Sequence, residues 1–335
     1  MTAEGEECIV LERQANETYE DYFVRLHDNK ANYGLTHRQI AALLNADTGQ
    51  NYGESAYRKE ARAFERGRQY ERKQHAPPRV ATRILALSDF HIPYQVPVET
   101  FSSYYGQVDV LVLNGDIEDC QSCSSFPKKY RVPFMEELIQ TREYLIRLIR
   151  SIHPRTVYFT RGNHEDRLLR YLSDKVSEDL LTLMPDSPLD LLIHMGFRNT
   201  DRGNGRVEQY ASLQEVLEDE VELIYTGDWK CKVGHTIFAH PLAYSSAMLK
   251  TTEKAVNYFL RTDRDFDSIV LAHTHKLGYY LQGGIAMYEQ GCCCRTDMLN
   301  YADGHLTLPQ QNGFLYLSQD ADGHILLDET KLIHF

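Results

Sequence analysis

The sequence lacks any long apolar stretch. Of its 335 residues 42% are hydrophobic, but every apolar run is far shorter than the roughly 20 residues that a transmembrane helix needs. Residues 1–7 hold three glutamates and no basic residue, unlike the basic start of a signal peptide. We therefore expect a cytoplasmic protein with no membrane partner.

Cysteines are few and poorly spaced for structural roles. There are seven, and an odd number suits free thiols in a reducing compartment. Cys120 and Cys123 have CxxC spacing, but no second pair follows at the distance that a zinc knuckle needs. Cys292, Cys293 and Cys294 are consecutive and cannot all point one way on a strand. Buried thiols are the favoured interpretation, and a redox-sensitive Cys120–Cys123 pair is the alternative.

Basic residues are outnumbered, 36 Lys and Arg against 48 Asp and Glu, which gives a net charge of −12. Residues 81–335 account for most of it, with 35 acidic and 24 basic residues. This excludes a protein that coats nucleic acid over its whole surface. The stretch 54–79 has the opposite sign, with 8 basic and 4 acidic residues, so a local basic contact stays open.

The chain does contain short apolar runs that end in metal-ligating side chains. Such runs predict buried strands, and open sheets place their chemistry just beyond the carboxyl ends of strands. Five strand ends could therefore converge on one site, after residues 87, 113, 160, 239 and 272. The candidate ligands that follow them are Asp89, His91, Asp116, Asn163, His240, His273 and His275.

These side chains offer only oxygen and nitrogen atoms. Mixed carboxylate and imidazole ligation suits manganese, iron or zinc better than magnesium or calcium. Seven ligands are too many for one tetrahedral ion and about enough for two. We expect two divalent transition-metal ions, with manganese preferred and iron or zinc as alternatives. Such a pair, about 3.5–4 Å apart, can hold the attacking and leaving oxygens of a displacement at phosphorus.

In order and spacing, these segments resemble the calcineurin-like metallophosphoesterase superfamily, whose motifs are D-x-H, G-D-x-x-D, G-N-H-[ED], H and G-H-x-H. The resemblance implies an α/β fold, a two-sheet sandwich flanked by helices. It also implies hydrolysis of a phosphate ester by a hydroxide that bridges the two metal ions. One departure is Ala272, where the family usually has glycine.

The resemblance also implies roles for single residues. The first metal would take Asp89, His91, Asp116 and His275. The second would take Asp116 as the bridging carboxylate, Asn163, His240 and His273. His164 would be the acid beside the leaving group.

Three neighbours of these motifs are candidate helpers. We interpret Asp119 as a partner of a site residue, with a turn cap as the alternative. Glu165 is expected to orient His164 or a ligand, unless it is a solvated loop charge. Arg161 is the preferred candidate among the nearby arginines to hold substrate phosphate, unless it pairs with an acidic neighbour.

Residues 1–75 predict a small all-α domain, joined by a linker at 76–81 to a metallophosphoesterase domain at 82–335. Thr36 and Gln39 form a capping box that opens a short helix, and a glycine-containing turn leads to a longer helix ending near residue 73. That outline is typical of a helix-turn-helix, and this region also resembles the N-terminal regions of phage-encoded metallophosphoesterases. The basic face of the longer helix consists of Arg58, Lys59, Arg62 and Arg66.

Two interpretations of this helical domain stay open. It docks the enzyme on DNA through phosphate contacts, or it is an appendage with a solvated basic face, for instance for oligomerisation. The oligomeric state itself is not predicted. Residues 165–225 carry no ligand motif and predict a mostly helical insertion that roofs the site. Residues from 221 onward predict a second, largely antiparallel sheet.

The leading functional interpretation is a phosphodiesterase or nuclease acting on nucleic acid, because a basic helical domain is joined to a phosphoesterase. The alternative is a protein serine/threonine phosphatase or another phosphomonoesterase. The segment 161–165 matches the form seen in protein phosphatases, but Cys120 stands where those enzymes usually carry an arginine. A third, less favoured interpretation is a DNA-binding adaptor with an idle phosphoesterase body.

Overall fold

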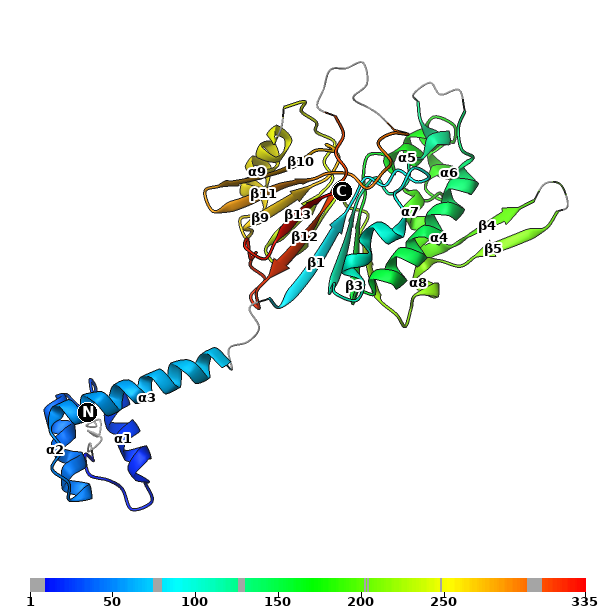
Figure 1. Cartoon of the computed structure of the whole chain (residues 1–335). Coiled ribbons are helices and arrows are strands. Elements are labelled where there is room, and N and C mark those ends of the chain that lie inside the picture. Colours follow the sequence, from blue (N-terminus) through cyan, green and yellow to red (C-terminus); the bar gives the residue numbers. More distant parts are fainter. Residues whose placement is uncertain are drawn as a thin grey trace, which may run out of the picture. The chain divides into compact units, whose positions relative to one another are not determined.

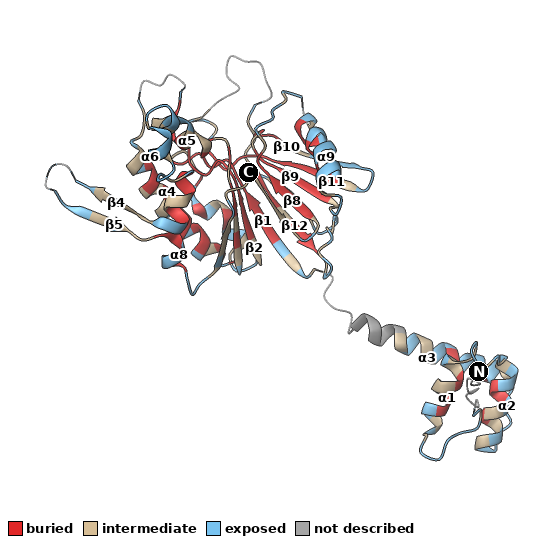
Figure 2. Cartoon of the chain, turned by 180° about the vertical axis from the view of Figure 1, so that it is seen from behind, coloured by how far each residue is buried: buried red, intermediate tan, exposed pale blue. Residues whose placement is uncertain are grey.

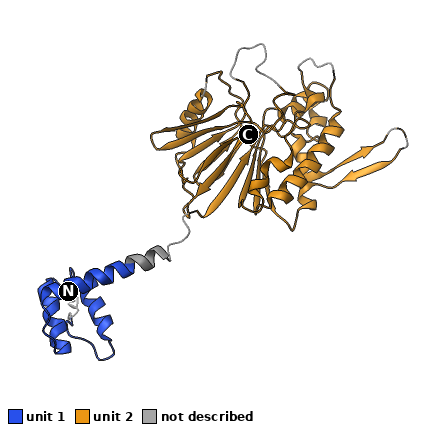
Figure 3. Cartoon of the chain, viewed as in Figure 1, with its two compact units in different colours: residues 1–78 blue, residues 79–335 orange. Residues whose placement is uncertain are grey.

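The computed structural model describes residues 10–74, 80–125, 130–201, 203, 205–247, 249–299 and 309–335, without the side chains of residues 69–74 (Figure 1). Buried residues gather in separate cores (Figure 2). Accordingly, the chain divides into two compact units, Met1–Pro78 and Arg79–Phe335 (Figure 3). The division falls within the segment 76–81, where the sequence predicts a linker. None of the described helices is both long and apolar enough to span a membrane.

The first unit consists of helices α1 (Tyr19–Asp28), α2 (His37–Thr48) and α3 (Glu54–Gln74). The capping box before α2 is formed as predicted, since Thr36 Oγ1 accepts from the Gln39 N–H and the Gln39 side chain accepts from the Thr36 N–H. Tyr57 and Ala61 lie on the face of α3 that packs into a core shared with α1 and α2. The basic face of α3 lies on the exposed side.

The second unit contains a six-stranded sheet in the order β13-β12-β1-β2-β3-β6. Its parallel strands are β1 (Thr82–Leu87), β2 (Val110–Asn114), β3 (Thr156–Thr160) and β6 (Glu222–Tyr225). β12 (Gly313–Gln319) and β13 (Lys331–His334) join antiparallel at the other side. Because β1, β2 and β3 are parallel, the loops that follow them start from the same edge of the sheet.

The second sheet has the order β10-β11-β9-β8-β7. Its strands are β7 (Lys230–Val233), β8 (Thr236–Ala239), β9 (Ser268–Leu271), β10 (Leu277–Gln282) and β11 (Ile285–Gln290). The prediction of a largely antiparallel sheet holds only for its two edge strands, because β7 and β10 pair antiparallel with β8 and β11, whereas β8, β9 and β11 are parallel to one another. The physical reason is α9 (Lys250–Thr262), a helical crossover that brings β9 back in the direction of β8. The last two strands, moreover, belong to the first sheet.

Strand alternation explains the layers of this unit. On β1, Ile84 and Ala86 face the second sheet, where they join a cluster with Phe238 and Val270. Leu85 and Leu87 point to the opposite face, which α4 (Phe134–Ile152) covers with its buried apolar stripe. On the outer face of the second sheet, α9 packs through Phe259. The unit is therefore a two-sheet sandwich between helices, the predicted fold class (Figure 2).

The segment 165–225, which the sequence predicts to be mostly helical, contains strands as well as helices. It holds α5 (Asp166–Ser173), α6 (Glu178–Leu181), α7 (Pro188–Asp190), η3 (Leu191–Met195), α8 (Leu213–Val216), and also β4 (Phe197–Thr200), β5 (Val207–Tyr210) and β6. β4 and β5 form a hairpin that projects away from the body of the unit (Figure 1). Two short 3-10 helices, η1 (Val98–Tyr104) and η2 (Gln121–Cys123), complete the fold. Within the segment 165–225, α5 begins three residues after the candidate ligand Asn163.

Candidate metal centre

The structure brings the predicted ligands together where the strands of the two sheets end. Three overlapping groups each place three ligand atoms within 4.8 Å of one another. They are Asp89, His91 and His275; His91, Asp116 and His164; and Asp116, His240 and His273. Asn163 joins the third group, because its Oδ1 lies 3.3 Å from His240 Nε2. Since the groups share members, the site is continuous.

Asp116 occupies the middle of this arrangement. Its Oδ2 lies 3.3 Å from His240 Nε2 and 3.9 Å from His91 Nε2. Its other oxygen, Oδ1, accepts a hydrogen bond from the His164 N–H. Burial raises the pKa of Asp116, but the nearby imidazoles of His164 and His240 outweigh burial and hold the pKa well below its usual range. The carboxylate is therefore ionised and can be shared between two cations.

The remaining contacts fit a cation on each side of Asp116. On one side, His275 Nε2 lies 3.0 Å from Asp89 Oδ1 and 3.1 Å from His91 Nε2, so ring nitrogens and a carboxylate face a common point. On the other side, His240 donates from Nδ1 to the Asn114 carbonyl at 2.8 Å, which turns Nε2 toward Asp116 and Asn163. This hydrogen bond fixes the tautomer that a metal ligand needs.

Burial also decides the charge of the imidazoles. Burial and the neighbouring His164 lower the pKa of His91 to about 4, and burial with the neighbouring His240 lowers the pKa of His273 to about 4. Both rings are therefore neutral near pH 7 and present lone pairs. Burial lowers the pKa of His240 as well, but the Asp116 carboxylate outweighs this and raises it to about 10. A cation that binds His240 must displace that proton.

The ligands lie on strained backbone. Asp89, His91, Asp116, His273 and His275 all have φ angles between 46° and 75°. Residues other than glycine rarely adopt this left-handed region, and such strain persists where the surrounding structure enforces it, often at functional sites. The geometry that points these five side chains inward is thus held by the fold.

Two glycines allow the loops to approach each other. Gly115 has a φ of 76°, and a Cβ atom there would overlap with the His240 imidazole. A Cβ on Gly162 would overlap with the Asp116 carboxylate and would approach Glu165 Oε2 to 2.9 Å. Both positions therefore require glycine for space, and Gly115 also for its backbone conformation.

Glu165 is a buried organiser of the site and not a solvated loop charge. Its carboxylate accepts hydrogen bonds from the backbone N–H groups of Gly162, Asp116, Ile117 and Glu118, at 2.7 to 3.2 Å. It thereby ties the loop after β3 to the loop after β2. The sequence predicts that Glu165 orients His164 or a ligand, and its hydrogen bond with the N–H of Asp116 agrees with the second alternative.

His164 lies between an acidic side chain, Asp119, and a basic one, Arg167. Asp119, which is buried, places its Oδ1 3.0 Å from His164 Nδ1. On the other side of the ring, Arg167 Nη2 lies 2.7 Å from His164 Nε2, and Arg167 Nη1 donates to the Asp119 carbonyl at 2.6 Å. Because a guanidinium can only donate, Nε2 is the accepting nitrogen and Nδ1 carries the proton. Asp119 is thus a partner of His164 and does not merely cap a turn.

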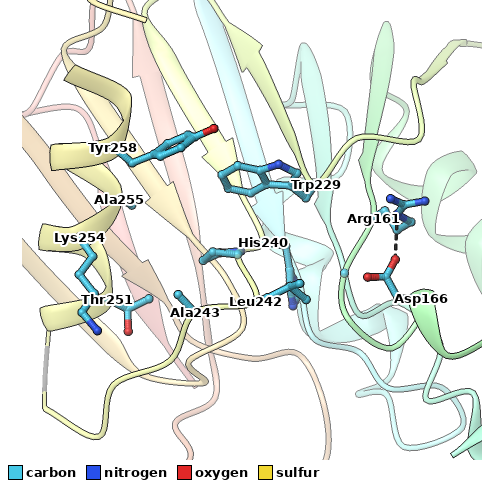
Figure 4. A pocket seen from close by; sticks show the side chains of 12 residues that line it. Arg161, Asp166, Trp229, His240, Leu242, Ala243, Thr251, Lys254, Ala255 and Tyr258 are labelled. Atoms are coloured by element: carbon cyan, nitrogen blue, oxygen red, sulfur yellow. Dashed lines mark ion pairs between the residues drawn. The ribbon is translucent and has the colours of Figure 1, made fainter. Parts of the chain in front are cut away.

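The other arginines near this motif have acidic partners. Arg161, the predicted phosphate contact, lies 3.0 Å from Asp166, and Arg170 lies 3.5 Å from the same carboxylate. Arg161 nevertheless lines a cavity that reaches His240 (Figure 4). Arg167 is therefore closer to the candidate acid than the arginine that the sequence favours.

Two further residues that the sequence does not single out contact the site through tertiary interactions. Asn114 accepts from His240 and from the Thr160 hydroxyl, and its amide lies 3.4 Å from the carbonyls of β8 and β9. The Ser88 hydroxyl donates to Asp89 at 2.5 Å. Both directly precede motif residues, which is the one signal that could have found them.

The described cysteines are all free. Cys120, Cys292, Cys293 and Cys294 are buried, as the favoured interpretation expects, whereas Cys123 and Cys231 are half-buried. Burial raises the pKa of the Cys120 thiol well above its ordinary value and that of Cys123 to about 11. Both therefore stay protonated and weakly reactive near neutral pH. Cys292 and Cys294 lie near His275, with the three ligand atoms within 4.8 Å.

The predicted nucleic-acid contacts, Arg58, Lys59, Arg62 and Arg66, lie in the first unit and are all exposed. Arg58 pairs with Glu54 one helical turn away. Arg58, Arg62 and Arg66 line a cavity of about 500 Å³ together with His27, His37 and Glu65. This cavity belongs to the helical unit alone.

Comparisons with known proteins cover both units. Residues 82–277 match the family model for calcineurin-like phosphoesterases, and residues 7–76 match the model of the YonJ N-terminal domain. A curated relative is the SPbeta prophage-derived uncharacterized protein YonJ of Bacillus subtilis (strain 168), 36% identical over 66 residues. That match covers 20% of this chain and only 16% of the relative. Both resemblances inferred from the sequence are confirmed.

Solved structures with a similar fold include Vacuolar Protein Sorting 29 from Cryptosporidium parvum, at 15% identity and a TM-score of 0.37, covering 76% of this chain and 98% of that one. A novel archaeal phosphodiesterase is 13% identical with a TM-score of 0.36, covering 76% and 99%. The phosphoesterase family model matches more than half of this chain. The chain therefore belongs to the calcineurin-like phosphoesterase family.

Proposed function

We propose that this protein is a dinuclear phosphodiesterase acting on nucleic acid. The observation that carries the proposal is the position of Asp116, whose carboxylate lies between the group of Asp89, His91 and His275 and the group of Asn163, His240 and His273. Two divalent ions bound there, manganese in the first instance, would supply an activated water and would neutralise charge on the phosphate.

The residues of the chain supply positioning and a proton. His164 is the acid that protonates the departing oxygen, and Asp119 holds its ring through Nδ1. Because Nδ1 carries the ring proton, proton delivery from Nε2 requires two changes: Arg167 leaves that nitrogen, and Nε2 takes up a proton from solvent, so that the ring becomes an imidazolium. The imidazolium then gives the Nε2 proton to the departing oxygen and returns to the neutral Nδ1–H form. A phosphate oxygen favours the departure of Arg167, because it is a stronger acceptor for a guanidinium than a neutral imidazole. Arg167 therefore passes from His164 to the substrate when the substrate binds.

The helical unit supports a nucleic-acid substrate. Lys59, Arg62 and Arg66 make no ion pair within the described part of the chain, and they lie on the exposed face of α3. Helices α2 and α3, joined through the turn at 49–53, have the outline of a helix-turn-helix. We propose that this face contacts the phosphates of DNA and thereby concentrates the substrate around the enzyme.

A second candidate, a phosphomonoesterase such as a protein phosphatase, is favoured by one observation. A monoester carries more negative charge than a diester and needs an additional cation beside the metals. Cys120 replaces the arginine that protein phosphatases carry in the second motif, but Arg167 brings a guanidinium to the carbonyl of the adjacent Asp119 from another element.

The test compares hydrolysis of bis-p-nitrophenyl phosphate and p-nitrophenyl phosphate by the manganese-loaded full chain, with Asp89→Ala as the blank. We expect a clear preference for the diester. A preference for the monoester that Arg167→Gln removes would establish the phosphatase instead. Turnover of neither, together with tight DNA binding, would favour the adaptor interpretation.

A further inference from the structure

A cavity of about 410 Å³ opens beside the candidate metal centre, and the proposed chemistry does not use it (Figure 4). It lies between α9 and the segment that follows β8, and the candidate ligand His240 forms part of its wall. Gly162, which precedes the candidate ligand Asn163, lines it as well. We name it the aromatic pocket, after Trp229 and Tyr258. A group bound there would be directly connected to a phosphate at the metals.

The walls of the aromatic pocket suit a flat apolar group. Trp229 and Tyr258 approach each other with ring centroids 6.0 Å apart, and Trp229 is backed by Phe259 at 5.7 Å in a stacked arrangement. Tyr258 is 50% exposed and Leu242 is 64% exposed. Large apolar side chains left exposed around a concave site are typical of ligand pockets.

The pocket is fixed relative to the metal centre by backbone hydrogen bonds. The Trp229 carbonyl accepts from the His240 N–H at 2.8 Å, and the Asp228 carbonyl accepts from the Arg161 N–H at 2.9 Å. The first bond ties the segment before β7, which carries the indole, to a candidate ligand. The second ties the same segment to the loop that carries Asn163. Backbone hydrogen bonds next to the ends of β3, β7 and β8 therefore hold the pocket beside the candidate ligands.

Polar groups at the rim match the edge of a heterocycle. Lys254 on α9 and Arg161 on the opposite wall are donors, and Asp166 is an acceptor (Figure 4). A nucleobase offers two stacking faces and an edge with both donors and acceptors, which is what aromatic side chains and such polar groups recognise. A cavity of this size lies within the usual range for small-molecule sites.

We propose that the aromatic pocket binds a nucleobase of the substrate, next to the phosphate that is cleaved. The inference rests on the proposed phosphodiesterase function and makes it more specific. The enzyme then prefers a diester that carries a nucleoside over one of the same charge that lacks it. Tyr258 and Trp229 provide the stacking surfaces for the base.

The chain contains a single tryptophan, so its fluorescence reports on this pocket without any turnover. We titrate the full chain with adenosine 5′-phosphate and, separately, with ribose 5-phosphate. Adenosine 5′-phosphate should change the emission in a saturable way, and ribose 5-phosphate should bind at least about tenfold more weakly. Tyr258→Leu should weaken binding of adenosine 5′-phosphate by about tenfold, within the range for loss of one base–aromatic stack.

The matched control is Tyr280→Leu on β10, because Tyr280 is also 50% exposed but does not line this pocket. It should leave both titrations unchanged. A kinetic comparison uses thymidine 5′-p-nitrophenyl phosphate and methyl p-nitrophenyl phosphate, which share charge and leaving group. Tyr258→Leu should lower kcat/KM for the nucleoside ester about tenfold more than for the methyl ester.

The outcomes separate the two proposals. Equal affinity for adenosine 5′-phosphate and ribose 5-phosphate, or an equal kinetic loss for both esters, overturns the base pocket. Tighter binding of phosphotyrosine than of the nucleotide overturns it in favour of a protein substrate. Tyr258-dependent nucleotide binding without hydrolysis of any diester supports the pocket and defeats the phosphodiesterase proposal alone.

Discussion

Asp116 has a position that its neighbour Asp119 does not share, although both are buried carboxylates in one loop. Asp116 Oδ2 faces ligands of both groups, whereas Asp119 faces His164 and His91. We predict that Asp116→Asn lowers the content of bound manganese well below two per chain, because the neutral amide cannot bridge two cations. Metal analysis of the dialysed protein measures this directly.

Asp119→Asn is the matched control for that experiment. It should keep the metal content of the natural sequence and lose activity, since Asp119 is not a candidate ligand and its carboxylate lies closer to His164, at 3.0 Å, than to the candidate ligand His91, at 3.7 Å. If Asp116→Asn retained two ions per chain, the bridging role would be wrong.

His164 can be tested through the leaving group. General acid catalysis contributes about 10²- to 10⁴-fold, and less when the leaving oxygen is a stable anion. We predict that His164→Asn retains metal but loses about 10²-fold or more in kcat on an alkyl ester. On a p-nitrophenyl ester the loss should be much smaller. Equal losses on both esters would contradict the acid role, because the histidine would then act before the bond to the leaving group breaks.

At the residue scale, the sequence predicted the groups that can bind metal but not what holds them. Asp89, His91 and His275 can be identified from the sequence because each follows an apolar run. The four backbone bonds to Glu165 and the contact of Arg167 with His164 depend on how two loops meet in space. No local pattern encodes such a meeting, so the sequence left Glu165 open and favoured Arg161 over Arg167.

At the scale of elements, the site depends on how closely its loops pack against each other. The loop after β3 approaches the loop after β2 so closely that a Cβ on Gly162 would overlap with the Asp116 carboxylate. We predict that Gly162→Ala lowers the free energy of unfolding by about 1–3 kcal/mol, the usual effect of overpacking, and weakens metal binding. Thermal unfolding with and without manganese measures both effects.

Gly67→Ala is the control, because it adds a Cβ atom at a glycine with free space around it. Gly67 lies in α3, where an added Cβ would meet nothing within 4 Å. Because alanine is favoured over glycine in a helix by about 1 kcal/mol, this variant should stabilise the helical unit. Unchanged metal content in Gly162→Ala would show that the two loops can separate without cost to the site.

The sequence predicted the strands more successfully than their directions. The runs before Asp89, Asp116 and Asn163 are strands β1, β2 and β3, as expected. The parallel pairing of β8 with β9 was missed, because residues 250–262 had not been identified as a crossover helix. Likewise, β4 and β5 are short, and their residues alternate only between half-buried and exposed positions. This weak alternation does not predict strands in a segment whose leucines favour a helix.

For the molecule as a whole, charge is distributed differently over the two units. If nucleic acid is the substrate, as proposed above, the acidic catalytic unit repels it at long range, and a local basic surface would bring the two together. The N-terminal unit offers that surface on α3. Its three helices have a hydrophobic core of their own, around Tyr22, Leu26 and Ile40, which allows it to present the surface independently. If α3 provides the DNA contact, the affinity for DNA should depend on salt through the basic residues of this helix.

Each phosphate contact that a basic residue makes to double-stranded DNA contributes about 0.9 to the slope of log K against log salt concentration. In an Asp89→Ala background, which prevents cleavage, we predict that changing Arg58, Arg62 and Arg66 together to Gln reduces that slope by about 2 to 3 and weakens binding at low salt. Fluorescence anisotropy with a labelled duplex at several salt concentrations gives the slope. The matched control changes Arg147, Arg150 and Arg206, exposed arginines of the catalytic unit, and should leave the slope nearly unchanged. The reverse pattern would place the DNA contact on the catalytic unit, and no change in either variant would make the basic face of α3 a solvated surface.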